Sequence, residues 1–365
     1  MGHLWQAGLV TAPPPPSPEP QPIVTPLRTA AIFLVLTIEA GGEDTVRDFL
    51  EDVSGLQRAV GFRLPEGDLS VVVGIGSDAW DRLFSGPRPA ELHSFRELQG
   101  PRHLAPATPG DLLFHLRADQ MGLCFEFATQ VMNRLAGVTT VQDEVQGFRY
   151  FDERDLMGFV DGTESPAGRA GEQAALVGAD DPDFTGGSYV MVQKYLHDMD
   201  SWNALTTEEQ ERVIGRHKLS DIEIPDDEKA PDSHVALNTI EDADGNERKI
   251  LRSNMPFGSP GRQEFGTYYI GYAASASVTE QMLENMFIGD PPGNTDRILD
   301  FSTAITGTLF FAPSADFLDD LPDPPASAAT LAAGDDTAGA PSPPAPTTES
   351  SGSLGIGSLR RSTSP

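Results

Sequence analysis

A carboxylate in an apolar stretch is the first group in the sequence that could do chemistry. In MGFVDGTESP, Asp161 follows Phe159 and Val160 and precedes a glycine. The pKa of a free aspartate is about 3.9, and burial among apolar side chains raises it, which favours a role as general base and acid. An aspartate before a glycine is also typical of an ordinary turn, so the stretch alone leaves both interpretations open.

Two further candidates share the segment ILRSNMPFG. Arg252 and Asn254 flank Ser253 between apolar residues, and in an extended strand both side chains project from the same face. A guanidinium beside an amide can stabilise developing negative charge. Taken alone, the segment fits equally well a half-buried strand whose arginine forms a salt bridge.

Among the seven histidines, His234 is the candidate metal ligand. It stands in PDSHVALNT, where a polar run gives way directly to an apolar one. A neutral imidazole can bind a metal there, although a lone histidine is more often a hydrogen-bonded core or cap residue. His115 is expected on the polar side of an alternating strand, and His197 is expected at the surface.

Composition narrows the function classes. The chain has 365 residues, 39% of them hydrophobic, which is enough for a sizeable core and two domains. Its formal net charge of −30 repels phosphate backbones and argues against nucleic-acid binding. The single cysteine, Cys124, excludes an internal disulfide, a cysteine-rich zinc site and an iron–sulfur cluster. We expect a cytoplasmic protein, because no signal peptide is recognisable and no apolar run approaches the roughly 18 residues of a membrane span.

These candidates must be positioned by the elements of a long middle region. Between about Pro26 and Phe317, the hydrophobic pattern predicts strands and helices in an order that occurs twice. In the first half we expect strands at 29–38, 69–73, 111–118 and 140–151 and helices at 43–60 and 124–135. In the second half we expect strands at 188–196, 266–274 and 307–311 and helices capped by Thr206 with Glu209 and by Ser277 with Glu280.

The repeated order predicts an α+β fold of two ferredoxin-like domains, of the dimeric α+β barrel type. The N-terminal domain is expected at 26–150 and the C-terminal domain at 151–317. A proline-rich disordered arm is expected at 1–25, and a disordered linker rich in acidic residues, proline and alanine at 318–350. The irregular insertion at 216–263 is too long for a simple connection, and such insertions usually carry function or are disordered.

Taken together, these motifs resemble the dye-decolourising peroxidases. The G-x-x-D-G pattern of that family occurs at Gly158, Asp161 and Gly162, and GSYVMVQKYLHDMDSWNAL, GRHKLSDIEI, DSHVALN, RSNMPFG and EFGTYYIGYAASASVTEQMLENMF follow in the same order. The similarity extends from about residue 26 to residue 315, and the Arg-Ser-Asn triplet is similar to the B-type bacterial branch. The resemblance implies one haem b in the second domain and the use of H2O2 to oxidise dyes, phenols or similar electron donors.

The resemblance also implies a role for each candidate. His234 corresponds to the proximal histidine that ligates the haem iron. Asp161, Arg252 and Asn254 correspond to the polar residues on the opposite face, where the aspartate handles the protons of peroxide and the arginine borders the haem. Glu223, in SDIEI, is similar to the carboxylate that orients the proximal imidazole. We expect Arg252 to matter at least as much as Asp161, because charge stabilisation often outweighs proton transfer.

Electrons from bulky donors must reach a shielded haem through the protein. Trp202, Tyr189 and Tyr195 are chemically able to relay electrons, although packing and hydrogen bonding are the commoner roles of such residues. The acidic residues Glu164 and Glu247 could attract Mn²⁺ as a further substrate, since this ion prefers oxygen ligands.

The C-terminal segment at 351–365, SGSLGIGSLRRSTSP, has the form of a docking peptide. Leu354, Ile356 and Leu359 make a small apolar cluster that is followed by Arg360 and Arg361. GSLGIGSLR is similar to the targeting peptide that loads cargo into encapsulin shells, and B-type peroxidases are typical cargo. The resemblance therefore implies an encapsulin shell as partner, a location inside that compartment, and a homo-oligomer.

Two other functions stay open at this point. Removal of iron from haem, as by a deferrochelatase, is suggested for some relatives. A haem-binding storage protein without catalytic activity, delivered as cargo, would carry the same haem ligand. Turnover of a dye with peroxide separates the peroxidase from the storage protein, and iron-free porphyrin as a product would mark the deferrochelatase.

Overall fold

In the computed structural model of the chain, the described residues are 18–163 and 165–326. Most of the expected N-terminal arm, Glu164, most of the expected linker and the whole docking segment at 351–365 lie outside them. The described part contains no helix that is both long and apolar enough to cross a membrane.

The N-terminal half contains four long strands and the helices that join them. Its strands stand side by side in the order β2-β5-β1-β6, and each neighbouring pair is antiparallel. The elements are β1 (Ala30–Ile38), α1 (Glu43–Glu51), α2 (Val53–Gly61), β2 (Ser70–Gly76), α3 (Ser77–Leu83), β3 (Leu98–Gln99), β4 (Leu104–Ala105), β5 (Leu112–Ala118), α4 (Met121–Arg134) and β6 (Thr139–Phe148).

The C-terminal half repeats this arrangement around a long insertion. Its strands stand in the order β10-β12-β7-β14, again antiparallel, and β11 continues the pairing of β10 along β12. The elements are α5 (Gly168–Ala175), β7 (Ser188–His197), α6 (Met199–Asn203), α7 (Thr207–Ile214), α8 (His234–Asn238), β8 (Ile240–Glu241), β9 (Glu247–Arg248), β10 (Leu251–Arg252), β11 (Met255–Ser259), β12 (Glu264–Ala273), α9 (Ala276–Phe287), β13 (Ser302–Ala304), β14 (Thr308–Ala312) and α10 (Ala315–Asp319).

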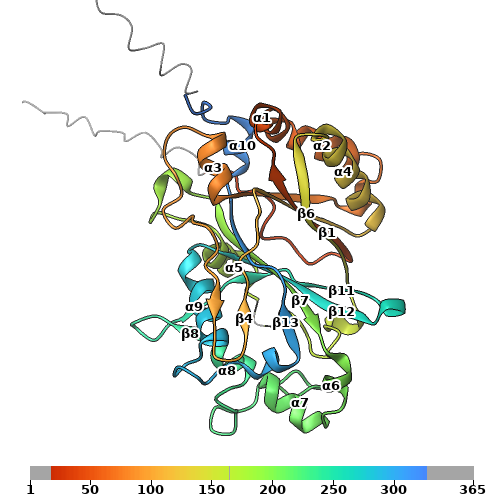
Figure 1. Ribbon diagram of the computed structural model, residues 1–365, viewed down its shortest axis with the longest axis vertical. Coiled ribbons are helices and arrows are strands. Elements are labelled where there is room, and N and C mark those ends of the chain that lie inside the picture. Colours follow the sequence, from red (N-terminus) through yellow and green to blue (C-terminus); the bar gives the residue numbers. More distant parts are fainter. Residues whose placement is uncertain (1–17, 164, 327–365) are drawn as a thin grey trace, which may run out of the picture. The chain divides into compact units, whose positions relative to one another are not determined.

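The two halves share one sheet. β14 pairs with β2 as well as with β7, so that ten strands are joined in the described part of the chain. The halves also approach each other closely at β6 and β11. Gly147 in β6 leaves no room for a side chain there, since a Cβ atom on it would lie 2.5 Å from the Cβ of Met255 in β11. Figure 1 shows α1, α2 and α4 together beside the N-terminal strands, whereas α6 to α9 lie beside the C-terminal ones.

The apolar core has two main parts. One lies where helices cover the sheet, and it includes every residue of the helical face predicted within 43–60: Val46, Phe49, Leu50, Val53, Leu56 and Val60. The predicted single helix is interrupted, since α1 ends and α2 begins around Asp52. The other part is enclosed by strands of both halves, with Phe33 from β1 and Tyr268 and Tyr272 from β12 among its members.

The expected boundaries of the folded region are wrong at both ends. Gln21 is buried, and its side-chain amide donates to the carbonyl oxygens of Val73 (2.8 Å) and Pro313 (2.9 Å). Leu318 is buried as well, and the backbone N–H of Ser85 donates to the carbonyl of Asp323 at 2.8 Å. Residues 18–25 and 318–323 therefore pack against the domain, although their proline-rich and acidic composition is typical of disorder.

Of the two predicted helix caps, one is confirmed and one is wrong. The Thr206 hydroxyl accepts from the backbone of Glu209 at 3.2 Å, and the Glu209 carboxylate accepts from the backbone of Thr206 at 2.8 Å, which completes a capping box on α7. At α9 the flanking residue is Ser275, and the backbone N–H of Ser277 donates to the carboxylate of Glu91 in the other half. A tertiary contact replaces the local cap there.

Candidate active site

A short hairpin positions Asp161. The backbone N–H of Asp155 donates to the Phe159 carbonyl at 2.8 Å, and the Asp155 carboxylate accepts from the backbone of Phe159 at 2.9 Å. Gly158 turns the chain with a φ of +94°, a value that side chains rarely allow. Asp161 stands three residues after Gly158, and its backbone N–H donates to the Glu153 carbonyl at 3.0 Å. Gly162, directly after Asp161, has a φ of +84°, and its carbonyl accepts from the backbone of Ser165 at 2.9 Å. Asp161 therefore does stand at a turn, as one interpretation held, and the turn presents its carboxylate.

Arg252 and Asn254 meet this hairpin from the sheet. The Asn254 side chain donates to Asp161 Oδ1 at 3.2 Å and accepts from the backbone of Ile270 at 3.0 Å, which fixes the amide orientation. The backbone of Arg252, in β10, donates to the Ser165 hydroxyl at 3.1 Å. Asp161, Arg252 and Asn254 line one side of the same cavity, and we call them the distal wall.

His234 lies in another part of that cavity's lining, at the first position of α8. Its Nδ1 lies 2.7 Å from Asp296 Oδ2, and the Asp296 side chain is fully buried whereas that of His234 keeps 25% of its exposure. Asp296 also accepts from the backbone of Ile298 at 2.9 Å. No hydrogen bond among the described residues involves His234 Nε2, so this nitrogen is available to a ligand. We call His234 and Asp296 the proximal wall.

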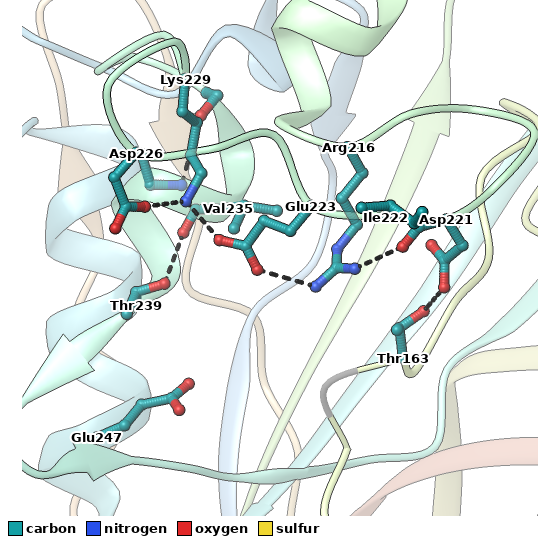
Figure 2. A network of polar contacts seen from close by, with 12 residues as sticks. Thr163, Arg216, Asp221, Ile222, Glu223, Asp226, Lys229, Val235, Thr239 and Glu247 are labelled. Carbon is teal, nitrogen blue, oxygen red and sulfur yellow. Dashed lines mark hydrogen bonds and ion pairs between the residues drawn. The ribbon is translucent and has the colours of Figure 1, made fainter.

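The structure corrects the expectation for Glu223. Figure 2 shows its carboxylate between two cations: one oxygen lies 3.2 Å from Arg216 Nη2, and the other contacts the ammonium of Lys229. Asp296 takes the place expected for Glu223 beside His234. Sequence reasoning missed Asp296 because it stands in the position of an ordinary helix N-cap, and because it is 62 positions away from His234.

The cavity between the two walls is mainly apolar. About 1440 Å³ lies free of protein atoms there, part of it open to solvent. The apolar side chains of its lining are Met157, Phe159, Val160, Ile214, Val235, Ile250, Met282, Leu283, Met286 and Ile298. Apolar sides, one available imidazole nitrogen and a separate polar wall fit a flat apolar ring with a metal at its centre. Among the described residues no group of three or more His, Cys, Asp or Glu side chains could hold a metal ion without such a ring.

Burial sets the charge of several groups around the cavity. Burial raises the pKa of Asp155 to about 7, and the neighbouring charge of Asp161 acts in the same direction. His197 was expected at the surface, but it lines the cavity with Nδ1 2.8 Å from the Ser302 hydroxyl and Nε2 2.9 Å from that of Thr267. Burial lowers the pKa of His197 to about 4, so that this imidazole is neutral and both its nitrogens are occupied.

The distal wall also borders a second, smaller pocket. Asp161, Arg252 and Asn254 line both, and the small pocket continues between Arg149, Tyr150 and other residues of the segment after β6. A small molecule therefore has an approach to the distal side chains that does not pass His234.

Comparison with known proteins assigns the two halves to one family. The N-terminal model of the Dyp-type peroxidases matches residues 20–149, and the C-terminal model matches residues 152–317.

Several relatives match over nearly their whole length. A dye-decolorizing peroxidase of Rhodococcus erythropolis is 65% identical over 94% of this chain and 97% of that protein, and one of Mycobacterium tuberculosis is 63% identical over 86% and 94%. Among solved structures, the encapsulated DyP-type peroxidase from Mycobacterium smegmatis has 67% identity and a TM-score of 0.83, covering 85% of this chain and 100% of that one. DyPB from Rhodococcus jostii RHA1 has 57% identity and a TM-score of 0.81, covering 83% and 98%.

Proposed function

This chain belongs to the Dyp-type peroxidase family, and we propose that it binds one haem b and uses H2O2 to oxidise dyes, phenols or similar electron donors. The observation that carries the proposal is that one apolar cavity is lined both by His234, which is bonded to Asp296, and by Asp161, Asn254 and Arg252. DypB variants of R. jostii RHA1 have been solved in complex with heme.

On the proximal side we propose His234 as the iron ligand. Its Nδ1–H donates to the Asp296 carboxylate, which leaves Nε2 for the iron and fixes the plane of the ring. Because Asp296 is a fully buried carboxylate, its negative charge makes the imidazole a stronger donor. Haem held by His234 would supply the iron that reacts with peroxide.

On the distal side we propose that Asp161 moves the proton of peroxide. Asn254 donates to Asp161 Oδ1, so Oδ2 is the oxygen able to take a proton from one peroxide oxygen and return it to the other. The fixed positive charge of Arg252 then stabilises the departing oxygen. The small pocket that borders these residues gives peroxide a route separate from that of larger donors.

The proposed architecture is two ferredoxin-like domains, expected at 26–150 and 151–317, combined as in a dimeric α+β barrel. In each half the four main strands, with β10 and β11 counted as one strand, stand in the order 2-3-1-4 when numbered along that half, which supports the ferredoxin-like assignment. The shared edge of β14 with β2 and the close approach of β6 to β11 support a barrel-like combination.

We propose that the segment at 351–365 docks in an encapsulin shell, and that its contact residues are Leu354, Ile356, Leu359 and Arg360. We also propose that the protein is a homo-oligomer inside that cytoplasmic compartment. The relative from M. smegmatis is described as encapsulated. Deleting 351–365 should abolish co-purification with the shell while dye turnover stays intact, and continued packaging would refute the docking role.

Mn²⁺ is a proposed additional substrate. A DypB variant of R. jostii RHA1 has been solved in complex with manganese. Glu247 lies 3.0 Å from the ammonium of Lys249, so a cation would compete with that lysine for the carboxylate. Unchanged Mn²⁺ oxidation in a Glu164→Gln/Glu247→Gln double variant would refute this role.

An absorption spectrum tests the main proposal. Protein reconstituted with haemin should give a sharp Soret band that changes on addition of one equivalent of H2O2, and a dye should then be bleached. A Soret band that does not respond to peroxide would indicate a storage protein, and iron-free porphyrin as product would indicate iron removal. No uptake of haem would refute all three functions.

A further inference from the structure

A tyrosine and a histidine form a buried, hydrogen-bonded pair between the two halves of the molecule. The Tyr272 hydroxyl, in β12, lies 2.7 Å from His115 Nδ1, in β5, and both side chains are completely buried. The pair joins the two halves of the molecule, since each half contributes one member. The ring of Phe33 stacks on His115 with 4.7 Å between centroids, which holds the imidazole in place.

The hydrogen-bond partners of this pair show which of its two groups is the donor. His115 Nε2 has no partner among the described residues. If His115 Nδ1 carried the hydrogen, two groups would lack a hydrogen-bond partner: the Tyr272 O–H and the unprotonated Nε2. If Nδ1 instead accepts from the Tyr272 O–H, only the Nε2–H lacks a partner. Because unsatisfied buried polar groups are costly, the Tyr272 hydroxyl donates to His115 Nδ1.

Both members of the pair are neutral in the resting protein. Burial holds the pKa of His115 well below its usual value, and the nearby charge of Arg117 acts in the same direction. Burial raises the pKa of Tyr272 well above its usual value, which Arg117 only partly offsets. Tyr272 therefore does not ionise by itself and can be oxidised only if its proton leaves together with the electron. His115 is the base already in contact with that proton.

The pair lies on the opposite face of β12 from the proposed haem cavity, since side chains three residues apart in a strand point to opposite faces. Tyr269 lines the cavity, and Tyr272 stands three residues further along β12, roughly 10 Å along the strand. In the pairing of β10 with β12, Tyr272 stands opposite Leu251 and Gly271 opposite Arg252. The backbone that carries Arg252 thus connects the distal wall to the pair.

We propose that Tyr272 and His115 form a redox-active pair that holds an oxidising equivalent when no donor is bound. Tyr272 gives one electron to the peroxide-oxidised haem and its phenolic proton to His115 Nδ1, and becomes a neutral phenoxyl radical beside an imidazolium. When an external donor later supplies an electron, that electron reduces the Tyr272 radical and the proton moves from His115 Nδ1 back to the Tyr272 oxygen. The buried cation of Arg117 disfavours the imidazolium, so that the proton is returned readily. The inference depends on the proposed peroxidase function, which supplies the oxidant.

Tyr268 provides a matched control. Tyr268 is on the same face of β12 as Tyr272 and is completely buried. Its ring stacks on Phe33, the residue that also stacks on His115, with 4.1 Å between the ring centroids. In the described part of the chain no histidine bonds to its hydroxyl. Loss of the hydroxyl from Tyr268 therefore changes a buried tyrosine without removing the proton acceptor.

The test is electron paramagnetic resonance of the full-length, haem-loaded protein, frozen shortly after one equivalent of H2O2 without donor, with ring-deuterated tyrosine to identify tyrosyl signals. We expect a tyrosyl radical that Tyr272→Phe largely removes and Tyr268→Phe retains. His115→Gln, whose amide oxygen accepts a hydrogen bond but takes up no proton, should also remove most of the signal. A signal retained in Tyr272→Phe, or one unchanged in His115→Gln, would overturn the proposal.

Two measurements keep the outcome decisive if a variant loses its haem. In the unmodified protein, with ¹⁵N-labelled histidine, double resonance should detect coupling of the radical to one histidine nitrogen, and absence of that coupling would also overturn the proposal. The optical change of the haem after peroxide is recorded in every sample. A sample without that change shows failure of the peroxidase function, whereas an optical change without a tyrosyl radical shows failure of the redox pair.

Discussion

The proximal and distal walls of the cavity hold their polar side chains in different ways. On the proximal side one 2.7 Å contact joins His234 to Asp296, whose carboxylate is completely buried and also accepts from the backbone. On the distal side Asp161 is only partly buried, and its amide partner Asn254 lies at 3.2 Å. The difference follows from the work proposed for each wall: a metal ligand must stay in one orientation, whereas a group that takes up and returns a proton must reach two oxygens of its substrate.

The largest effect is expected from breaking the proximal wall. His234→Ala removes the only proposed iron ligand, so the variant should lose the sharp Soret band and all peroxidase activity in a haemin titration. His197→Gln is the matched control, because His197 also lines the cavity but has both nitrogens bonded to Ser302 and Thr267. If the control lost haem binding as His234→Ala does, or His234→Ala retained it, His234 would not be the ligand.

The next largest effect is expected in the distal wall. Arg252→Leu should slow the reaction with peroxide by about 10²–10³-fold, the usual loss when a group that stabilises developing charge is removed. Asp161→Ala should lose as much or less, because water reaching the partly buried site can carry the proton. Stopped-flow absorption of the haem after mixing with H2O2 measures both rates. A larger loss in Asp161→Ala would show that proton transfer outweighs charge stabilisation here.

A smaller effect is expected when the proximal wall keeps its shape but loses its charge. Asp296→Asn retains an oxygen that can accept from His234 Nδ1, yet it removes the anion, and such changes beside a metal ligand typically cost about 10–100-fold in affinity or activity. The reduction potential of the haem should rise because the imidazole donates less strongly. Glu223→Gln is the control, since that carboxylate is bonded to Arg216 and Lys229. An equal change of the haem reduction potential in Asp296→Asn and Glu223→Gln would show that the Asp296 carboxylate has no specific effect through His234.

The same comparison shows how much the sequence can predict. The apolar face of α1 and α2 and the capping box of α7 depend on neighbours within a few residues, and both are found as predicted. The turn at Gly158 and Gly162 is also local, and it is one of the two interpretations that the sequence left open for Asp161. Asp161, Arg252, Asn254 and His234 come from distant segments, and only the resemblance to a family indicated that they line one cavity. Asp296 was missed because a hydrogen bond between residues 62 positions apart has no local pattern.

His115 shows why alternation in a strand can mislead. The pattern of DLLFHLRA predicts a polar face, yet all seven residues of β5 are buried. Helices cover one face of this strand, and strands of the C-terminal half enclose the other. When a sheet is covered on both faces, polar side chains on it face an interior and must find partners there. The tertiary arrangement, which no single strand encodes, decides the environment of His115.

The smallest expected effect concerns the hairpin that presents Asp161. The folded-state pKa of Asp155 is raised to about 7 by burial and by Asp161, so between about pH 4 and 7 the folded state binds the proton more strongly than the unfolded chain does. Its contribution to stability is therefore full at low pH and is lost as the pH rises through about 7. Asp155→Asn keeps an acceptor for the Phe159 N–H but does not titrate.

Urea unfolding of the haem-free protein at pH 5 and pH 8 measures this effect. At pH 8 Asp155→Asn should have a higher free energy of unfolding than the parent protein. The upper limit of this gain is about 4 kcal/mol, and the actual gain should be smaller because the half-buried carboxylate keeps contact with water. Asp155→Ala also loses the acceptor for Phe159 and should lie below Asp155→Asn at both pH values by about 1–3 kcal/mol. A difference between Asp155→Asn and the parent that does not change between pH 5 and pH 8 would mean that Asp155 does not titrate in this range and that the hairpin does not raise its pKa.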